Sequence, residues 1–563
     1  MAVVSEPSNL ENGHDSDEKP QLTVQDTNGY IADASADNRG NLKTAKDSHT
    51  VLIPQPSDDP NDPLNWGTVK KHVVLLTVSL AAFLPDFGSA VGAVMLLPQA
   101  AQWNMSPDTV NHSQAGNVFM LGVGGIATVI LSAWAGRLPV LFWFVVMATA
   151  TAAWCAAATT FESFMAARIL NGFFATVAQA GGMMFIFDMF FFHERARKIN
   201  IWIAFVILSP YLGPLIAAFI ITTEPWPVAF WVYFAIVSTI HSSLKQQDET
   251  CAIALISTAL FVSETYYDRR IPIADQPPPA SRIAQVVGIA QYRTRHQRAT
   301  ITEALKRSAL TITRPTMILC CLYAMLTFAW VIGINTTLSV FLTPLYGFGP
   351  RQIGFFYFAP VVAAILGEIV GHWLHDAIAG WYIKKHDGHF EPEVRLMAVF
   401  FSTPFMVAGL VGLGFALEEG YHYMVTAVCW GLYVFGIMIT TVGLNAYNLD
   451  CYPNASGEVA AWLNMSRGKS FPFFLIPFKS ISRMSQQVDT RGEQSVTQIL
   501  YETVGAGFII SYFQITWAQV QGTKISFGIQ GAIVAASFLI ILVVLIYGKR
   551  IRQKAGPLKF STV

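Results

Sequence analysis

Long apolar runs alternate with short polar connections along most of the chain. A helix that crosses a bilayer needs about 20 mainly apolar residues. Eleven stretches of this kind predict eleven membrane spans, at residues 72–96, 114–135, 140–158, 163–187, 201–221, 315–338, 353–375, 396–417, 424–447, 504–518 and 527–547. The pattern predicts an all-α membrane protein.

A twelfth span is expected between the fifth run and the sixth, but the apolar pattern is broken there. Residues 226–236 and 252–262 are each apolar and too short to cross a bilayer. The segment between them carries four ionisable side chains: His241, Lys245, Asp248 and Glu249. Each charge costs roughly 2.5–3.5 kcal/mol at bilayer depth on insertion scales. Removing residues 237–254 joins the two apolar pieces into one span of the required length.

We hypothesise that residues 237–254 are a retained intron, because Val237-Ser238 is readable from GTAAGT, a common intron start. A second suspect, residues 468–502, opens with a Gly-Lys-Ser that is readable from GGTAAGT, and lengthens the connection before the eleventh span. The alternative is that both segments are genuine loops. Sequencing the cDNA distinguishes the two, and the intron hypothesis leaves open whether this exact chain folds.

Composition narrows the class of protein. Hydrophobic residues make up 53% of the chain and charged residues 13%, about half the roughly 25% that is typical of globular proteins. This argues against a soluble multidomain enzyme. Lys plus Arg and Asp plus Glu both number 36, so the basic footprint of a nucleic-acid binder is missing. The six cysteines lack the paired spacing of a zinc site, and no metal or cofactor is expected.

The lysines and arginines that flank the spans predict the orientation, because such residues concentrate in cytosolic loops. Apart from Arg351 and Lys524, they fall in alternate connections, which places both termini in the cytosol. The expected order is a disordered tail over 1–58, a six-helix bundle over 59–263, a basic cytosolic segment over 264–314, a second six-helix bundle over 315–548 and a cytosolic tail over 549–563.

The same orientation sorts the Asn-X-Ser/Thr sequons, which are glycosylation acceptors when they face outward. Asn104 and Asn111 lie in the first outward loop and are expected to carry glycans. Asn454 and Asn464 are expected to face the cytosol, and Asn335 lies within a span. These three are expected to be unmodified.

Local motifs add a family resemblance. Residues 166–172 place Arg168 four residues before Gly172, and residues 209–218 contain Gly213 and Pro214. The first resembles the fourth-span motif of the major facilitator superfamily, and the second resembles the fifth-span antiporter motif, with small residues replacing several of its glycines. Further motifs look like signatures of the fungal drug:proton antiporter branch, at residues 59–66, 190–195, 264–269, 391–396, 456–458 and 526–530.

The resemblance implies twelve transmembrane helices in two six-helix halves that rock around a site near the bilayer midplane. It implies a monomer in the lipid bilayer of the cell membrane, or of the vacuole, whose partners are a small-molecule substrate and protons. One departure stands out: before Gly136-Arg137, where the family carries Asp-Arg, this chain has Ala133 and Trp134. Two other pairs are candidates for the missing charge contact, Asp188 with Arg195 and Asp376 with Arg395, and ordinary solvated loop charges are the alternative.

Ionisable residues inside a membrane are expensive and mark candidate functional sites. Asp86 lies in the first span and Arg168 in the fourth. Both helices line one cavity in the resembled fold, so an Asp86–Arg168 pair could form a proton-linked switch. The alternative is a permanent structural pair, or two groups that are satisfied separately.

Glu368 and His372 lie four residues apart in the eighth span and therefore on one helix face. A carboxylate beside an imidazole can bind a proton near neutral pH, since histidine titrates around 6.5 when unperturbed. A hydrogen bond that packs helices together is the alternative. No third ligand accompanies the two groups, so no metal site is expected.

Gly213 and Pro214 have a different chemistry. Proline removes a backbone donor, and glycine permits close helix approach, so the fifth span is expected to bend and pack tightly. The resemblance implies a role in closing the cavity against proton leak.

The leading functional prediction is a proton-coupled efflux transporter of small organic molecules, such as a drug, a toxin or a fungal secondary metabolite, and not an enzyme. The first alternative is a facilitative or proton-symport importer of the same fold. A sugar-porter-like Pro-Glu-Ser motif is missing after the sixth span, where Glu264-Thr265-Tyr266 stands. The second alternative is a membrane receptor or an intramembrane enzyme, for which neither a metal-ligand helix motif nor a large extramembrane domain is found.

Overall fold

The computed structural model describes residues 25–26, 29–31, 43–44, 52–238, 254–269, 271–277, 280–386, 389–468, 514–515 and 517–556. Most of the expected N-terminal tail, residues 557–563 of the expected C-terminal tail and most of both suspected introns lie outside these residues. Within them the protein is a helical bundle with three very short strands, β1 (Gln25–Asp26), β2 (Gly29–Ile31) and β3 (His389–Phe390), which form one small sheet.

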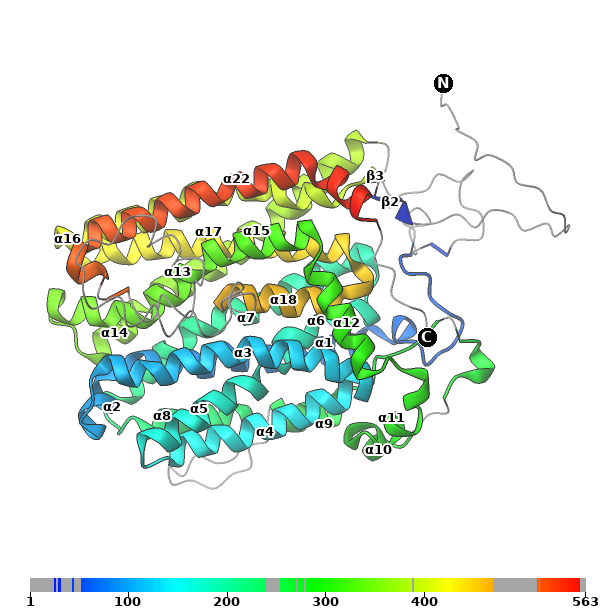
Figure 1. Cartoon of the computed structure of the whole chain (residues 1–563), viewed down its shortest axis with the longest axis horizontal. Coiled ribbons are helices and arrows are strands. Elements are labelled where there is room, and N and C mark those ends of the chain that lie inside the picture. The colour runs from blue at the N-terminus through cyan, green and yellow to red at the C-terminus, as the bar shows by residue number, and fades with distance from the viewer. Residues whose placement is uncertain are drawn as a thin grey trace, which may run out of the picture.

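The apolar runs of the first half form the helices on one side of the bundle (Figure 1). These helices are α1 (Thr68–Val91), α2 (Leu96–Trp103), α3 (Pro107–Ala135), α4 (Arg137–Ala157), α5 (Phe161–Ala175), α6 (Val177–Met189), α7 (Phe192–Ile220), α8 (Pro227–Ser238) and α9 (Ala254–Phe261). Local chemistry determines where several of them begin. Ser106 caps α3 by accepting from Thr109 N–H, and Pro107 occupies the first turn, where its missing N–H costs nothing.

The second half contains α13 (Pro315–Tyr346), α14 (Pro350–Phe356), α15 (Phe358–Lys385), α16 (Ala398–Glu418), α17 (Tyr423–Cys451), α18 (Ser456–Gly468) and α22 (Thr523–Ala555). The central segment forms α10 (Arg282–Val287), α11 (Ile289–Arg293) and α12 (Ile301–Ile312), and α12 begins at a capping box made by Thr300 and Glu303. Short 3₁₀ turns occupy Pro63–Asn65, Gly92–Val94, Ile273–Asp275, Arg295–Gln297, Pro392–Met397 and Pro453–Ala455.

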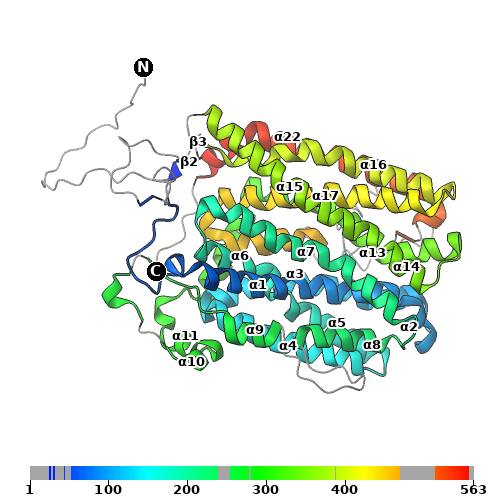
Figure 2. The same cartoon turned by 180° about the vertical axis from the view of Figure 1, so that it is seen from behind.

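Ten helices among the described residues are long and apolar enough to cross a membrane, and Pro227–Val237 is a shorter apolar helix. The sixth predicted span appears as two pieces, α8 and α9, which both pack along α4. Figure 2 shows them in line beside that helix. The residues between them, 239–253, lie outside the described chain. That the two pieces belong to one span therefore stays a prediction.

The structure does not test the position predicted for the eleventh span. We predict residues 504–518, with 468–502 in the connection before them, and most of both ranges lies outside the described residues. The residues that precede them, Ser456–Gly468, form α18, which packs inside the bundle against α3, α6 and α13. Glu458, Asn464 and Arg467 lower the hydropathy of this stretch and hid it. Asn464 is accordingly buried in a helix and does not lie in a cytosolic loop.

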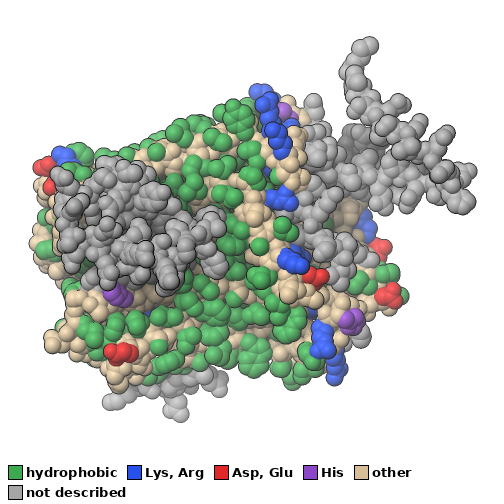
Figure 3. Space-filling view, viewed as in Figure 1, with side chains coloured by type: hydrophobic (Ala, Val, Ile, Leu, Met, Phe, Trp, Pro, Cys, Tyr) green, Lys and Arg blue, Asp and Glu red, His purple; other side chains and the backbone are tan. Residues whose placement is uncertain are grey.

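The bundle has a charged end. The central helices α10 to α12, the start of α1 and the end of α22 lie at the same end of the molecule (Figures 1 and 2). Figure 3 shows that most of the visible Lys and Arg side chains gather toward this end, while hydrophobic side chains cover much of the face between the ends. The alternation of charge that is visible in the sequence therefore corresponds to two physical ends of one bundle.

Candidate functional site

A small cavity of about 50 Å³ lies between the two halves. Its walls come from α1, α3 and α7 of the first half and from α13 and α18 of the second, and they include Asp86, Gln114, Phe328, Asn335, Asn464 and Arg467. Charged and amide side chains therefore face one another at the centre of an otherwise apolar bundle. Such groups inside a membrane protein mark substrate or ion pathways.

Asp86 enters this cavity from the middle of α1. Its Oδ2 accepts a hydrogen bond of 2.5 Å from Nε2 of Gln179, which is buried in α6. This bond joins α1 to α6. Asp86 is half-buried and lines the cavity.

Arg467 is the residue that sequence reasoning missed. It lies at the end of α18 with 7% of its surface exposed, lines the same cavity as Asp86, and interacts electrostatically with that carboxylate. Its guanidinium carbon is 5.7 Å from the centre of the Phe328 ring. The residue stands beside the suspected intron, in a stretch whose polar residues are typical of a connection. The only signal in the sequence is an arginine four residues after apolar Trp462-Leu463.

Arg168 binds the backbone of α1, and the expected ion pair with Asp86 is wrong. Its Nη1 donates to Gly88 O at 2.5 Å and its Nη2 to Ser89 O at 2.8 Å, and a further bond goes to Gln114 Oε1. The reason is that α1 ends at Val91, which leaves its last four carbonyls without α-helical partners. The guanidinium, 1% exposed, satisfies two of them and thereby ties α5 to α1.

Glu368 and His372 lie in α15, which packs against α7, but the surroundings of the two side chains differ. Nδ1 of His372 is 3.3 Å from Nδ2 of Asn200, and its Nε2 is 3.8 Å from Asp376 Oδ2. In the part of the chain that is described, Oε2 of Glu368 is buried without a hydrogen-bond partner.

Gly213 and Pro214 allow α7 to contact α1 in the first half and α13 in the second. A Cβ on Gly213 would lie 2.6 Å from Phe87 O and 3.3 Å from Val91 N, so only glycine permits this approach to α1. Pro214 has no N–H to give to Pro210 O, four residues earlier. Nδ2 of Asn335 in α13 donates to that carbonyl instead, at 2.9 Å. The fifth-span motif therefore creates an acceptor that the opposite half uses.

Ion pairs at the charged end differ from the two pairs that we considered, and both of those are wrong. Asp188 pairs with Arg137, the arginine that the family motif retains in this chain. Arg395 pairs with Asp450 at 3.1 Å, and Asp376 lies 3.6 Å from Arg197. The chain folds Asp188, at the end of α6, beside the start of α4, which sequence spacing alone does not reveal.

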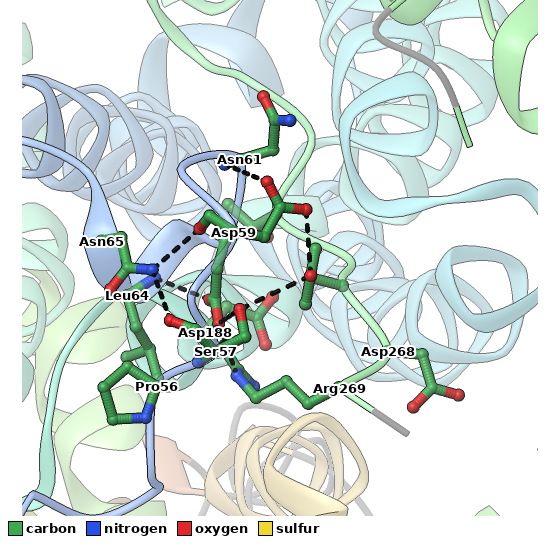
Figure 4. A network of polar contacts seen from close by, with 12 residues as sticks. Pro56, Ser57, Asp59, Asn61, Leu64, Asn65, Asp188, Asp268 and Arg269 are labelled. Atoms are coloured by element: carbon green, nitrogen blue, oxygen red, sulfur yellow. Dashed lines mark hydrogen bonds and ion pairs between the residues drawn. The ribbon is translucent and has the colours of Figure 1, made fainter. Parts of the chain in front are cut away.

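A second polar network fastens the entry to α1 onto the central segment (Figure 4). Arg269 donates two hydrogen bonds to Asp62, at 3.0 and 2.7 Å, and Tyr267 OH donates to Asp59 Oδ2 at 3.0 Å. Asn65 donates to the Ser57 and Asp59 carbonyls. Burial raises the pKa of Asp62, but the bonds from Arg269 and from Leu64 N–H outweigh it, so the pKa lies below its ordinary value.

The two outward sequons have different surroundings. Asn104 is exposed at the end of α2, whereas Asn111 is 3% exposed inside α3. A glycan needs an accessible side chain, so only Asn104 offers one in this structure. Among the described residues, no group of three or more His, Cys, Asp or Glu side chains could hold a metal ion.

Comparisons with known proteins identify the family. The family model described as Major Facilitator Superfamily matches residues 78–475. A Schizosaccharomyces pombe protein described as an uncharacterized transporter of this type is 26% identical over 72% of this chain and 78% of its own length. The efflux pump radE of Floropilus chiversii is 23% identical over 74% of this chain and 76% of its own.

Solved structures share the fold at low sequence identity. The proton:xylose symporter XylE, bound to a bromodeoxyglucose, aligns over 86% of this chain and 96% of its own with a TM-score of 0.54 and 14% identity. The human organic anion transporter MFSD10 aligns over 84% and 99% with a TM-score of 0.52 and 14% identity. The chain therefore belongs to the major facilitator superfamily, a family of multi-pass membrane transporters and not of enzymes.

Proposed function

We propose that this protein exports small organic molecules, such as a drug, a toxin or a secondary metabolite, in exchange for protons. The observation that carries the proposal is Asp86, a half-buried carboxylate that faces the cavity between the two halves. A carboxylate at that position can take up a proton from either side as the halves alternate. Gln179 binds that carboxylate through its side-chain amide.

Antiport requires that a proton and the substrate favour different conformations. Loss of the charge on Asp86 weakens its attraction to Arg467 across the halves. Glu368, with its buried and unpartnered oxygen at the contact of α15 with α7, is a second proton-binding position. The hydrogen bond from Asn335 to Pro210 O joins the two halves, and both residues line the same cavity. Protonation therefore changes the interface that separates the two conformations.

The direction of transport is supported by relatives. One is named an efflux pump, and this chain has the fifth-span glycine and proline that pack α7 onto α1. In this proposal the protein lies in the cell membrane or the vacuolar membrane. Both termini and the central segment face the cytosol. Asn104 is the glycan acceptor, and an endoglycosidase shift that Asn104→Gln abolishes tests that assignment.

A specific observation favours symport as a second candidate. Asp86 and Arg467 face the same cavity, so protonation of Asp86 leaves a positive charge that an anionic substrate would neutralise. When a proton and an anion bind together, the net charge of the cavity does not change. An importer that takes up both by symport has this charge balance. Neutral and cationic substrates lack this advantage.

Proton movement in proteoliposomes tests both candidates. Vesicles that contain a trapped pH dye are challenged with a panel of neutral, cationic and anionic organic molecules. Efflux by antiport predicts proton flow opposite to substrate flow, and symport predicts flow in the same direction. Asp86→Asn is expected to abolish substrate-driven proton flow, whereas Asp58→Asn, at an exposed carboxylate, leaves it unchanged. Undiminished proton flow in Asp86→Asn would contradict the proposal.

A further inference from the structure

An apolar groove of about 440 Å³ lies on the outer surface of the first half, away from the central cavity. Its floor comes from the last turn of α3 and the first two turns of α4, and its far wall from α10 and α11. The lining includes Leu131, Trp134, Ala135, Trp143, Val287 and Tyr292. The groove is therefore built from one membrane-spanning pair and from the central segment that docks against it.

The central segment is held in place by specific contacts. Trp143 Nε1 donates to Val287 O at 3.3 Å. Gly288 has a φ of 101°, and a Cβ at that residue would lie 3.2 Å from Pro139. The left-handed turn between α10 and α11 therefore lies directly on the start of α4 and leaves the groove beside it.

The groove opens onto an exposed apolar surface. Trp143, Met147 and Trp154 are 48%, 41% and 41% exposed and recur along one face of α4. On the other wall, Tyr292 is 62% exposed, and Ile283, elsewhere in α10, is 75% exposed. Segments that expose apolar and basic side chains together lie in the plane of the membrane interface, and tryptophans concentrate at that depth. These features match a groove at the membrane interface, where acyl chains begin.

Its charge indicates which lipid fits. Arg295 lines the groove, with its guanidinium carbon 4.5 Å from the centre of the Tyr292 ring, and Arg293 is exposed two residues earlier. The lining residues include no acidic side chain. Basic residues at the membrane surface attract anionic headgroups, and each contributes about 1 kcal/mol, or about fivefold in affinity.

We propose that this groove binds an anionic phospholipid, with an acyl chain between Trp134, Trp143 and Tyr292 and its headgroup beside Arg295. The site joins the central segment to the first half through a lipid. It depends on neither the direction of transport nor the substrate.

Native mass spectrometry of the detergent-purified full chain tests the proposal, with phosphatidylserine and phosphatidylcholine of identical acyl chains. We expect bound lipid with a preference for phosphatidylserine. Arg295→Gln is expected to weaken phosphatidylserine binding about fivefold. Arg351→Gln is the matched control, because it removes another exposed arginine beside an aromatic ring, Phe355, and is expected to have no effect.

A second variant tests the acyl chain. Ala135→Trp fills the groove and is expected to reduce binding of both lipids. Equal binding of the two lipids to the unmodified chain would overturn the headgroup assignment, and unchanged binding in Ala135→Trp would overturn the groove itself. Lipid binding is measured without transport, so failure here is distinguishable from failure of the proposed efflux function.

Discussion

Asn335 of the second half donates its side-chain N–H to the carbonyl of Pro210 in the first half, at 2.9 Å. Replacing Asn335 with Leu leaves that partly buried carbonyl without this donor, which costs up to roughly 1–3 kcal/mol. The cost applies only to the conformation in which α7 and α13 meet here. We expect the populations of the two alternating conformations to shift by about 5- to 150-fold, measured by spin-label distances between the halves.

Asn445→Leu is the control for that experiment. Its Nδ2 donates to Thr441 O at 2.8 Å, within its own helix. Its loss is expected to leave the distance distribution unchanged. Equal shifts in the two variants would show that the contact between the halves has no special role.

Arg168 is expected to be required for stability. Arg168→Ala leaves the Gly88 carbonyl without this donor and leaves the Ser89 carbonyl with Gln114 Nε2 alone, and roughly 1–3 kcal/mol is lost for a buried unsatisfied group. Arg168→Lys supplies one point charge in place of a planar fork and is expected to recover only part of the loss. Thermal unfolding of the purified variants measures this. A lysine variant as stable as the original would show that charge alone, and not the two-carbonyl geometry, matters.

Gly213→Ala is expected to impair packing and transport together. The added Cβ would meet Phe87 O at 2.6 Å, and overpacking of this kind costs roughly 1–3 kcal/mol. Gly528→Ala is the comparison, since a Cβ there meets no atom within 4 Å, and we expect it to be neutral or slightly stabilising. Proton leak and unfolding temperature are measured for both. Identical behaviour would contradict a close-packing role.

Acidification is expected to release the entry segment from the central segment. Because the pKa of Asp62 is below its ordinary value of 3.8, its contribution to stability is present above 3.8 and disappears as the pH falls through the lower folded value. Hydrogen exchange over residues 57–66 at pH 2–6 measures the release. Asp62→Asn should exchange fast throughout, and an unchanged pH profile in that variant would rule out Asp62 as the titrating group.

Deleting both suspected introns is expected to improve folding. Without residues 237–254, the pieces that pack along α4 join into one span, and without 468–502, α18 joins the span predicted over 504–518. Size-exclusion profiles should show a larger monodisperse fraction than those of the full chain. An equally long deletion in the tail over 1–58 is the control. Transcripts that retain both segments would favour the loop interpretation.

The sequence predicted the long helices because each one buries a continuous apolar run. It failed where a helix carries polar groups that only partners in the fold make tolerable. The polar sequence of α18 is typical of a connection. In the fold, however, Asn464 donates a hydrogen bond to Thr176 of the first half. Hydropathy averages cannot register such long-range partners.

Candidate side chains were easier to find than their partners. Asp86, Arg168 and Glu368 stood out as charges in apolar runs, and the structure places all three inside the bundle. The bond from Arg168 to free carbonyls depends on where α1 ends, and the pairing of Asp188 with Arg137 depends on how α6 meets α4. Both depend on where helix ends lie in space. A single sequence, read without an alignment, does not reveal those positions.

The central segment is fastened at both ends of its length. Glu264 accepts from Arg137 N–H at the start of α4 and from Gln291, and Arg307 pairs with Glu458 of α18 at 3.1 Å. The segment therefore joins the start of α4 in the first half to α18 in the second by side-chain contacts as well as by the chain itself. Any change in the distance between Arg137 and Glu458 must break one of these contacts or rearrange residues 264–307.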